Sequence, residues 1–399
     1  MTVSGLSAVS TAEKTVNATS AHMSHTISTL LEMALEEGTL PGGVLLASRA
    51  GIPLVSLAFG SKLPRGEEDS EKLHGEMTVD TVFDLGGLTE SICTATLLMR
   101  LASAGKIGAH DRASRFLQAL GVGQKSSMTL AHLLSHSAGF PTGISVYDDL
   151  VKANAGPRPG ILASSGAKQY AYTHFHNLPL KFEPGTRELR ADANYIVLGE
   201  ICEIITGLPL DKAYARYVAA PLKTGSLNFI DLTLLRRRGL EPVVEIFAPS
   251  GRCSRRGRVL AGEVWDENTW AMGGVSGHSG LFGTARDVHT WASEIVRGYR
   301  GESSLLSSEV VRSFVDPEHA TSKLEYKLGF EPVSREHGFV DSKVAPRACV
   351  SVGSTGCSVF IEPEREIVSV FLTNAGFSGH MSRRFPALRA DIHAALLEV

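Results

Sequence analysis

One stretch, residues 81–106, constrains the fold more than any other part of the chain: TVFDLGGLTESICTATLLMRLASAGK. A short extended segment ends at Leu85, and Gly86 and Gly87 then provide a turn. After the turn, apolar residues recur with the 3.6-residue period of an α-helix at Leu88, Ile92, Ala95, Leu98 and Ala102. A strand that turns sharply into a helix presents the free N–H groups of the first helical turn at one place. The stretch therefore predicts a site at this corner.

The composition is that of an ordinary globular protein, with 399 residues, 43% hydrophobic and 20% charged. This length predicts about two domains or one two-lobed body. A formal net charge of −3 argues against nucleic-acid and membrane-surface partners. No run approaches the ~18 apolar residues of a transmembrane helix. Residues 1–20 have neither a basic region nor an apolar run, so we expect a disordered tail, no signal peptide and a cytoplasmic location.

The five cysteines are dispersed and form no C-x-x-C pair. Their spacing predicts neither a zinc site nor a disulfide framework, and reduced thiols are the simpler interpretation. The sequence shows no cofactor motif, so we expect no cofactor and no metal.

The remaining patterns predict an antiparallel sheet made from both chain ends, with a mainly helical part between them. We expect one lobe from residues 21–85 and 300–399, and a helical lobe from 86–299. The expected helices are 21–37, 128–141, 193–206, 285–297 and 383–397. The expected strands are 43–50, 53–60, 348–352, 358–361 and 367–373. Residues 147–182 are rich in Gly, Ser and Pro at their start, and we expect an irregular excursion there.

Several segments resemble the serine β-lactamase and penicillin-binding-protein superfamily, and in particular its class C-like branch of esterases, DD-peptidases and acyltransferases. They include TVFDLGGLTE, MTLAHLLSHSAGFP, FEPGTRELRADANYIVLGEI and GEVWDENTWAMGGVSGHSGLFGTARDV. The resemblance covers nearly the whole chain, from about residue 28. It implies an α/β (α+β) fold of the β-lactamase/transpeptidase type, with a cleft between the two lobes.

The family's chemistry requires a serine and a lysine in an S-x-x-K signature, together with a tyrosine that assists proton transfer. Where the resemblance implies the motif F-D-L-A-S-L-T-K, this chain has FDLGGLTE. Gly87 therefore stands in place of the nucleophile and Glu90 in place of the lysine. The tyrosine position of the Y-x-N/D motif is Arg190. All three groups that perform acyl-serine chemistry are substituted.

Other positions of the family's site are partly kept. The resemblance maps Asp192 onto the last residue of the Y-x-N/D motif, and His278 matches a motif histidine. Trp265 replaces an expected histidine, and the K/H-T-G triplet falls on Ser351-Val352-Gly353. The backbone N–H groups of Gly87 and Ser354 would be the oxyanion-hole donors. We therefore expect Gly87, Asp192, Trp265, His278, Ser351, Gly353 and Ser354 to line the cleft.

Glu90 and Arg190 are the candidate catalytic residues, and we expect them to form an ion pair because a carboxylate alone in a cleft is costly. The favoured hypothesis is a non-hydrolytic ligand-binding protein or pseudoenzyme. One alternative is a repurposed isomerase, cyclase or lyase that uses Glu90 as base and Arg190 as electrophile. Another is an esterase or acyltransferase with a relocated nucleophile, since S-x-x-K strings also occur at 103–106 and 165–168.

The expected partner is a small-molecule or acyl-type ligand in the cleft between the lobes. Seven arginines lie between Arg236 and Arg258. They are interpreted as a solvated loop or, alternatively, as a docking patch for an acidic or phosphorylated partner.

Overall fold

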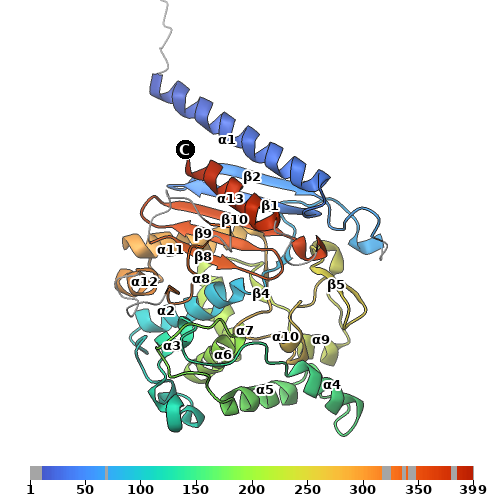
Figure 1. Ribbon diagram of the computed structural model, residues 1–399, viewed down its shortest axis with the longest axis vertical. Helices are drawn as coiled ribbons and strands as arrows, with labels where there is room; N and C mark the ends of the chain where they lie inside the picture. Colours follow the sequence, from blue (N-terminus) through green and yellow to red (C-terminus); the bar gives the residue numbers. More distant parts are fainter. Residues whose placement is uncertain are drawn as a thin grey trace, which may run out of the picture.

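The computed structural model describes residues 11–67, 71–316, 325–334, 338–339, 347–378 and 384–398. Five antiparallel strands from both chain ends form the main sheet, in the order β2-β1-β10-β9-β8 (Figure 1). Their bounds are Gly42–Arg49 for β1, Ile52–Gly60 for β2, Cys349–Val352 for β8, Ser358–Glu362 for β9 and Ile367–Thr373 for β10. The predicted antiparallel sheet from both chain ends is confirmed.

The two faces of this sheet pack against different helices. Leu45 and Phe371 contact α1 (Thr11–Glu36) and α13 (Arg384–Leu397), whereas Val44 and Val370 join the larger core on the opposite face. That opposite face is covered by α11 (Ala285–Arg300), with α12 (Ser308–Val315) beside it. Side chains of successive strand residues therefore alternate between two cores.

The helical part of the chain lies on the α11 side of the sheet (Figure 1). Its helices are α2 (Thr96–Ser103), α3 (Leu130–Leu134), α4 (Tyr147–Ala155), α5 (Ser165–Asn177), α6 (Asp192–Thr206), α7 (Leu210–Tyr214), α8 (Ala220–Leu222), α9 (Leu232–Arg238) and α10 (Glu267–Ala271). The short strands are β3 (Phe83–Asp84), β4 (Asn228–Phe229), β5 (Gly251–Cys253), β6 (Arg258–Leu260) and β7 (Leu281–Gly283). The prediction of α6 is confirmed, including its end at Gly207, which has φ 67°.

Two predictions in this part are wrong. The helix expected over 128–141 is only Leu130–Leu134, because His136 adopts φ 52° and Gly139 adopts φ 91°, which ends the regular helix. The excursion expected over 147–182 contains α4 and α5. Ser164 caps α5 by accepting a hydrogen bond from Ala167 N, so the helix begins directly after this serine.

Two predicted boundaries differ from the structure. Helix α1 begins at Thr11, whereas residues 1–10 of the predicted tail lie outside the described residues. Helix α11 packs on β1 and β10, although the predicted helical lobe ran to residue 299. The division into two lobes otherwise stays a prediction.

Within the described residues, no single helix has the length and apolar character needed to cross a membrane. One bent pair, Asp192–Thr206 with Leu210–Leu222, passes that test by length and composition at a 68° bend.

Candidate functional site

The predicted corner is present and is held by Asp84, the last residue of β3. One carboxylate oxygen of Asp84 accepts a hydrogen bond from Gly86 N at 2.9 Å, and the other accepts one from Trp265 N at 2.6 Å. Thr355 Oγ1 donates to the Asp84 carbonyl at 2.8 Å. Burial raises the pKa of Asp84 to about 6, although these two backbone N–H groups act in the opposite direction. Asp84 thus joins the corner to the loop that carries Trp265 and to the turn after β8.

A side chain at Gly87 would be crowded by its neighbours. Gly86 adopts φ 52°, but Gly87 does not have a positive φ, so its backbone would accept any residue. A Cβ at Gly87 would lie 2.8 Å from the Arg190 guanidinium and 3.0 Å from the carbonyl oxygen of Val352. The Arg190 guanidinium therefore occupies the space next to the missing side chain. In the described part of the chain, the Gly87 N–H has no hydrogen-bond acceptor.

Glu90 and Arg190 form the expected ion pair, with 3.5 Å between Arg190 Nη2 and Glu90 Oε2. Glu90 is buried, and the Arg190 side chain is 38% exposed. Arg190 Nη2 also lies 3.4 Å from Glu331 Oε1, a second buried carboxylate. Glu331 lies in no sequence motif and was not predicted; its backbone bridge to Val350 of β8 brings it here. Arg190 is therefore a cation held between two carboxylates.

His136 is the third neighbour of Glu90, with 3.3 Å between His136 Nε2 and Glu90 Oε2. The other ring nitrogen, Nδ1, faces the N–H of Ala191 at 3.4 Å and the amide group of Asn194 at 3.2 Å. Because Nδ1 accepts from these donors, the proton of the neutral ring is on Nε2 and is donated to Glu90. A histidine of the MTLAHLLSHSAGFP segment therefore contacts Glu90, the residue at the lysine position that the resemblance implies.

The protonation of Glu90 follows from these neighbours. Burial acts to raise the pKa of Glu90, but Arg190 and then His136 outweigh it and leave that pKa below its ordinary value. Glu90 is consequently a carboxylate at neutral pH and a weak proton acceptor.

The first helical turn after the corner is wider than an α-helix. Residues Glu90–Ala95 form a π-helical turn, in which Thr96 N donates to Ser91 O. Thr96 Oγ1 also donates to Ser91 O at 2.8 Å, and it accepts from Trp291 Nε1 at 2.8 Å. Such π turns are frequent at functional sites. This one anchors the helix that carries Glu90 to α11.

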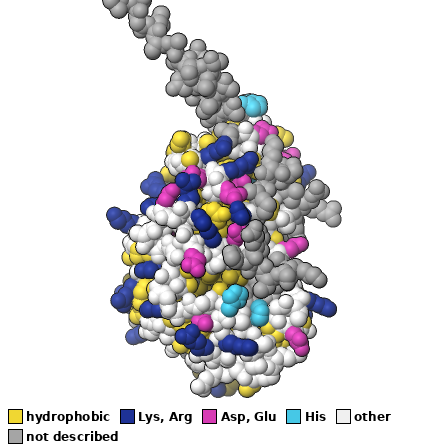
Figure 2. Space-filling view, turned by 90° about the vertical axis from the view of Figure 1, so that its left-hand side faces the viewer, with side chains coloured by type: hydrophobic (Ala, Val, Ile, Leu, Met, Phe, Trp, Pro, Cys, Tyr) yellow, Lys and Arg dark blue, Asp and Glu magenta, His cyan; other side chains and the backbone are white. Residues whose placement is uncertain are grey.

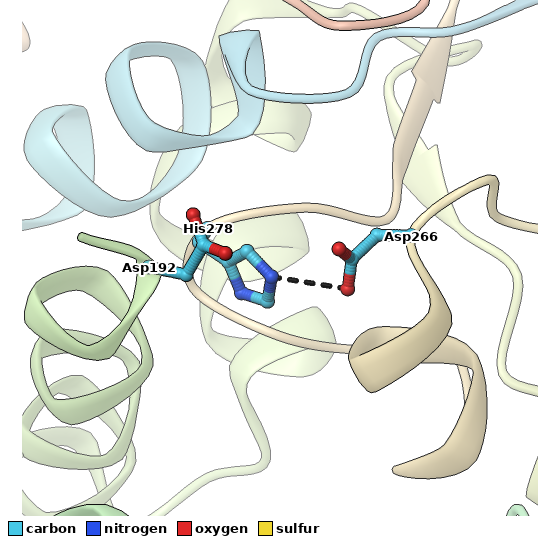
Figure 3. Close-up of side chains that lie close together, drawn as sticks. All are labelled: Asp192, Asp266 and His278. Atoms are coloured by element: carbon cyan, nitrogen blue, oxygen red, sulfur yellow. Dashed lines mark hydrogen bonds and ion pairs between the residues drawn. The ribbon is translucent and has the colours of Figure 1, made fainter. Parts of the chain in front are cut away.

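A second polar cluster contains Asp192, Asp266 and His278 (Figure 3). Asp192 begins α6, Asp266 caps α10, and His278 lies in the loop before β7. His278 Nε2 lies 3.1 Å from Asp266 Oδ1, and Ser276 Oγ lies 2.9 Å from His278 Nδ1. The expected positions of Asp192 and His278 are thus side by side, and the sequence analysis had given Asp266 no role.

The three side chains offer two carboxylates and one imidazole whose ligand atoms all lie within 4.8 Å of one another. These are ligand types for a divalent cation. Burial opposes charging of His278, but Asp266 and then Asp192 raise its pKa to about 9. An imidazolium therefore supplies positive charge to the two carboxylates at neutral pH.

We expect His278→Gln to lose stability in a pH-dependent way. A histidine with a raised folded-state pKa contributes stability that is complete below its unfolded pKa of about 6.5, and this contribution is lost as pH rises toward about 9. The difference in unfolding free energy between wild type and variant should be at most about 3 kcal/mol at pH 6 and shrink by pH 9. Urea titrations across this range measure it. His289→Gln is the matched control: it removes a hydrogen bond to Ser48, but burial lowers the pKa of His289, so its effect on stability should not shrink between pH 6 and pH 9. A pH-independent difference for His278→Gln would contradict the imidazolium.

The other predicted site residues contact the corner mainly through backbone or hydroxyl groups. Ser351 Oγ is buried and accepts from Ser91 Oγ at 2.9 Å. Gly353 packs against the Leu85 carbonyl so closely that a Cβ there would lie 2.6 Å from it, and Ser354 is exposed on the following turn. The ring of Trp265 lies against Gly251.

In both S-x-x-K strings the lysine contacts a group other than the serine of its string. Ser103 ends α2, about 20 Å along the helix from Glu90, and its hydroxyl accepts from Ser307 N. Lys106 lies over the Tyr217 ring. Lys168 pairs with Glu203 at 2.6 Å. Both lysines therefore have contacts that differ from those of a base next to a serine.

The arginines between 236 and 258 are mostly paired within the chain. Carboxylate partners are Glu67 for Arg252, Asp148 and Glu267 for Arg255, and Glu263 for Arg256 and Arg258. Figure 2 draws another face of the molecule, on the α12 side of Figure 1, where Lys and Arg side chains also lie among Asp and Glu side chains. The docking patch stays a prediction. Because these arginines pair with carboxylates of the same chain, fewer of them are available to an acidic partner than their number implies.

Comparisons with known proteins show the family to which the chain belongs. The family model named Beta-lactamase matches residues 25–393, so the chain belongs to the β-lactamase family. A relative from Escherichia coli (strain K12), named "Putative D-alanyl-D-alanine carboxypeptidase", is 28% identical over 317 residues, which are 74% of this chain and 70% of the relative.

Solved structures show the same fold. EstCE1, a hydrolase with promiscuous acyltransferase activity, has a TM-score of 0.69 and 21% identity, covering 94% of this chain and 98% of that one. The octameric penicillin-binding protein homologue from Pyrococcus abyssi has a TM-score of 0.67 and 17% identity, covering 93% and 77%. The predicted family and fold class are confirmed.

Proposed function

We propose that this protein is a non-hydrolytic member of the β-lactamase family that binds a small acyl-type ligand without forming an acyl-serine. One observation carries the proposal. Gly87 has no side chain, and the guanidinium of Arg190 lies 2.8 Å from where its Cβ would stand. The space used for nucleophilic attack in the family is thereby occupied by a cation.

The same geometry bears on what the ligand would be. Arg190 is already balanced by Glu90 and Glu331. A free anion would have to compete with two carboxylates for it, so a neutral carbonyl group is the better match. The Gly87 N–H, which lacks an acceptor in the described part of the chain, would donate to such a carbonyl.

The repurposed-enzyme alternative has less support. A general base at neutral pH needs a pKa near 7, whereas Arg190 and His136 together keep the pKa of Glu90 below its ordinary value despite burial. A relocated serine has no support from Ser91 or Ser351, whose hydroxyls contact each other. A cytoplasmic location is part of the proposal and agrees with five buried, free cysteines.

The proposal is tested by covalent labelling and by equilibrium binding. Wild-type protein should remain unlabelled by excess fluorescent penicillin and fluorophosphonate, under conditions that label a serine-containing family member completely. N-acetyl-D-alanyl-D-alanine amide, a neutral peptide chosen from the name of the relative, should bind in calorimetry without being hydrolysed. Covalent labelling of the wild type would overturn the proposal, and peptide hydrolysis would do the same.

A further inference from the structure

A pocket of about 550 Å³ lies away from the corner, at the junction of α2, α8, α11 and the loop before α12. Its lining includes Arg100, His289, Arg297 and Ser304. Arg100 follows Glu90 by ten residues on the same helical segment, a separation of about 15 Å. The pocket is therefore distinct from the site at Gly87.

Arg100 is partly buried, yet its guanidinium has no hydrogen bond, ion pair or aromatic contact within the described ranges. Other partly buried arginines of the chain have carboxylate partners: Arg256 pairs with Glu263 and Arg347 pairs with Asp316. A partly desolvated cation without a counter-charge is unfavourable. Arg100 consequently lacks a counter-ion, and the pocket beside it has room to hold one.

Further donors line the same pocket. Arg297 is 58% exposed, and its nearest carboxylate contact, with Glu294, is a long 3.9 Å. Ser304 is exposed, and neither its hydroxyl nor its backbone N–H has a partner in the described part of the chain. Two guanidinium groups with a serine N–H and hydroxyl are the donor set that binds tetrahedral or planar oxyanions.

The acidic and titratable groups of the pocket do not cancel this charge. Glu294 is buried; its carboxylate accepts a hydrogen bond from Ser303 and contacts Arg297. Burial lowers the pKa of His289, so this ring is neutral at pH 7. Two arginines therefore face one carboxylate.

We propose that this pocket binds an oxyanion, the phosphate or carboxylate group of a small molecule, with Arg100 as its principal partner. The guanidinium of Arg100 would form a charge-assisted pair with the oxyanion, and Arg297 and Ser304 would complete the contacts.

The test uses the full chain and simple anions. Inorganic phosphate and acetate are titrated in calorimetry and thermal-shift experiments, with sodium chloride at equal ionic strength as reference. We expect at least one of the two anions to stabilise the wild type beyond chloride. Stronger binding of phosphate identifies a phosphate ligand, and stronger binding of acetate identifies a carboxylate.

Arg100→Met keeps the apolar stem of the side chain and should lower the affinity for the anion by about tenfold or more. Arg297→Met, at a more exposed position, should lower the affinity less. This variant provides the test of the pocket if Arg100→Met does not fold. Arg286→Met on the same helix as Arg297 is the matched control, because this exposed arginine pairs with Asp80 outside the pocket. A wild type that responds to both anions only as it does to chloride would overturn the inference. Unchanged binding in both pocket variants would overturn it as well.

Discussion

Replacing Arg190 by methionine will lower the free energy of unfolding by about 2 kcal/mol at pH 7 to 8. The variant leaves Glu90 and Glu331, both buried, without the cation that lies 3.5 Å and 3.4 Å from them. Removing one partner of a fully buried ion pair costs about 3–5 kcal/mol. We expect less here because the Arg190 side chain is 38% exposed and solvent screens part of its field.

The loss will depend on pH in a defined direction. In the wild type the pKa of Glu90 is held below its ordinary value, so Glu90 contributes stability above about pH 4.5 that is lost as pH falls through its folded-state pKa. Without Arg190, burial raises that pKa. Protonation of Glu90 on acidification then removes the unpaired buried charge and reduces the destabilisation of the variant. The gap between wild type and variant should therefore be widest near pH 8 and narrower at pH 5.

Urea titrations at both pH values measure this gap. Arg187→Met is the matched control, because Arg187 is exposed and has no ion pair in the described ranges; its effect should stay within about 0.5 kcal/mol. Adding Glu90→Gln to Arg190→Met should recover part of the loss at pH 8, since one buried charge is removed. If Arg190→Met were as stable as the wild type at pH 8, the ion pairs of Arg190 with Glu90 and Glu331 would not stabilise the fold.

Restoring the family's three side chains together will restore covalent chemistry, whereas restoring the serine alone will not. Gly87→Ser by itself places a Cβ 2.8 Å from the Arg190 guanidinium and 3.0 Å from the Val352 carbonyl. Such overpacking costs about 1–3 kcal/mol, and no lysine is present to take the hydroxyl proton. The single variant should be less stable than the wild type and remain unlabelled by fluorophosphonate.

The triple variant Gly87→Ser, Glu90→Lys and Arg190→Tyr removes the guanidinium and supplies a base one helical turn from the serine. We expect fluorophosphonate labelling and a gain of about 100-fold in p-nitrophenyl acetate hydrolysis, the lower end of what a positioned general base contributes. The matched control carries Gly87→Ala with the other two changes, and it should show neither. A folded triple variant that behaves like this alanine control would show that the motif mapping at this corner is wrong.

Much of the architecture could be predicted because it depends on local patterns. The strands of the main sheet alternate or run apolar, so their positions in the sequence indicate buried ladders whatever the rest of the chain does. The corner at Gly86 also follows from local chemistry, since its φ of 52° suits glycine. Helices α4 and α5 were missed because Gly-, Ser- and Pro-rich flanks hide short amphipathic segments, and packing stabilises them.

The site was predictable only in part. The sequence showed Glu90 at the lysine position and Arg190 at the tyrosine position. These residues carry opposite charges, and the structure places them in contact. Glu331 could not be found in this way, because only its bridge to β8 brings it to Arg190. The π turn at Glu90–Ala95 was also hidden, since no local pattern marks it and its contact through Thr96 is with Trp291 of α11, far along the chain.

The absence of serine and lysine from residues 85–90 follows from the sequence alone, because side-chain chemistry is a property of residue type. What lies beside Gly87 instead depends on the fold of the whole chain. It places the Arg190 guanidinium beside the backbone of Gly87, with Glu90, Glu331 and His136 arranged around the same pair of groups. Burial makes that arrangement necessary, since each of these carboxylates is removed from water and must be paired.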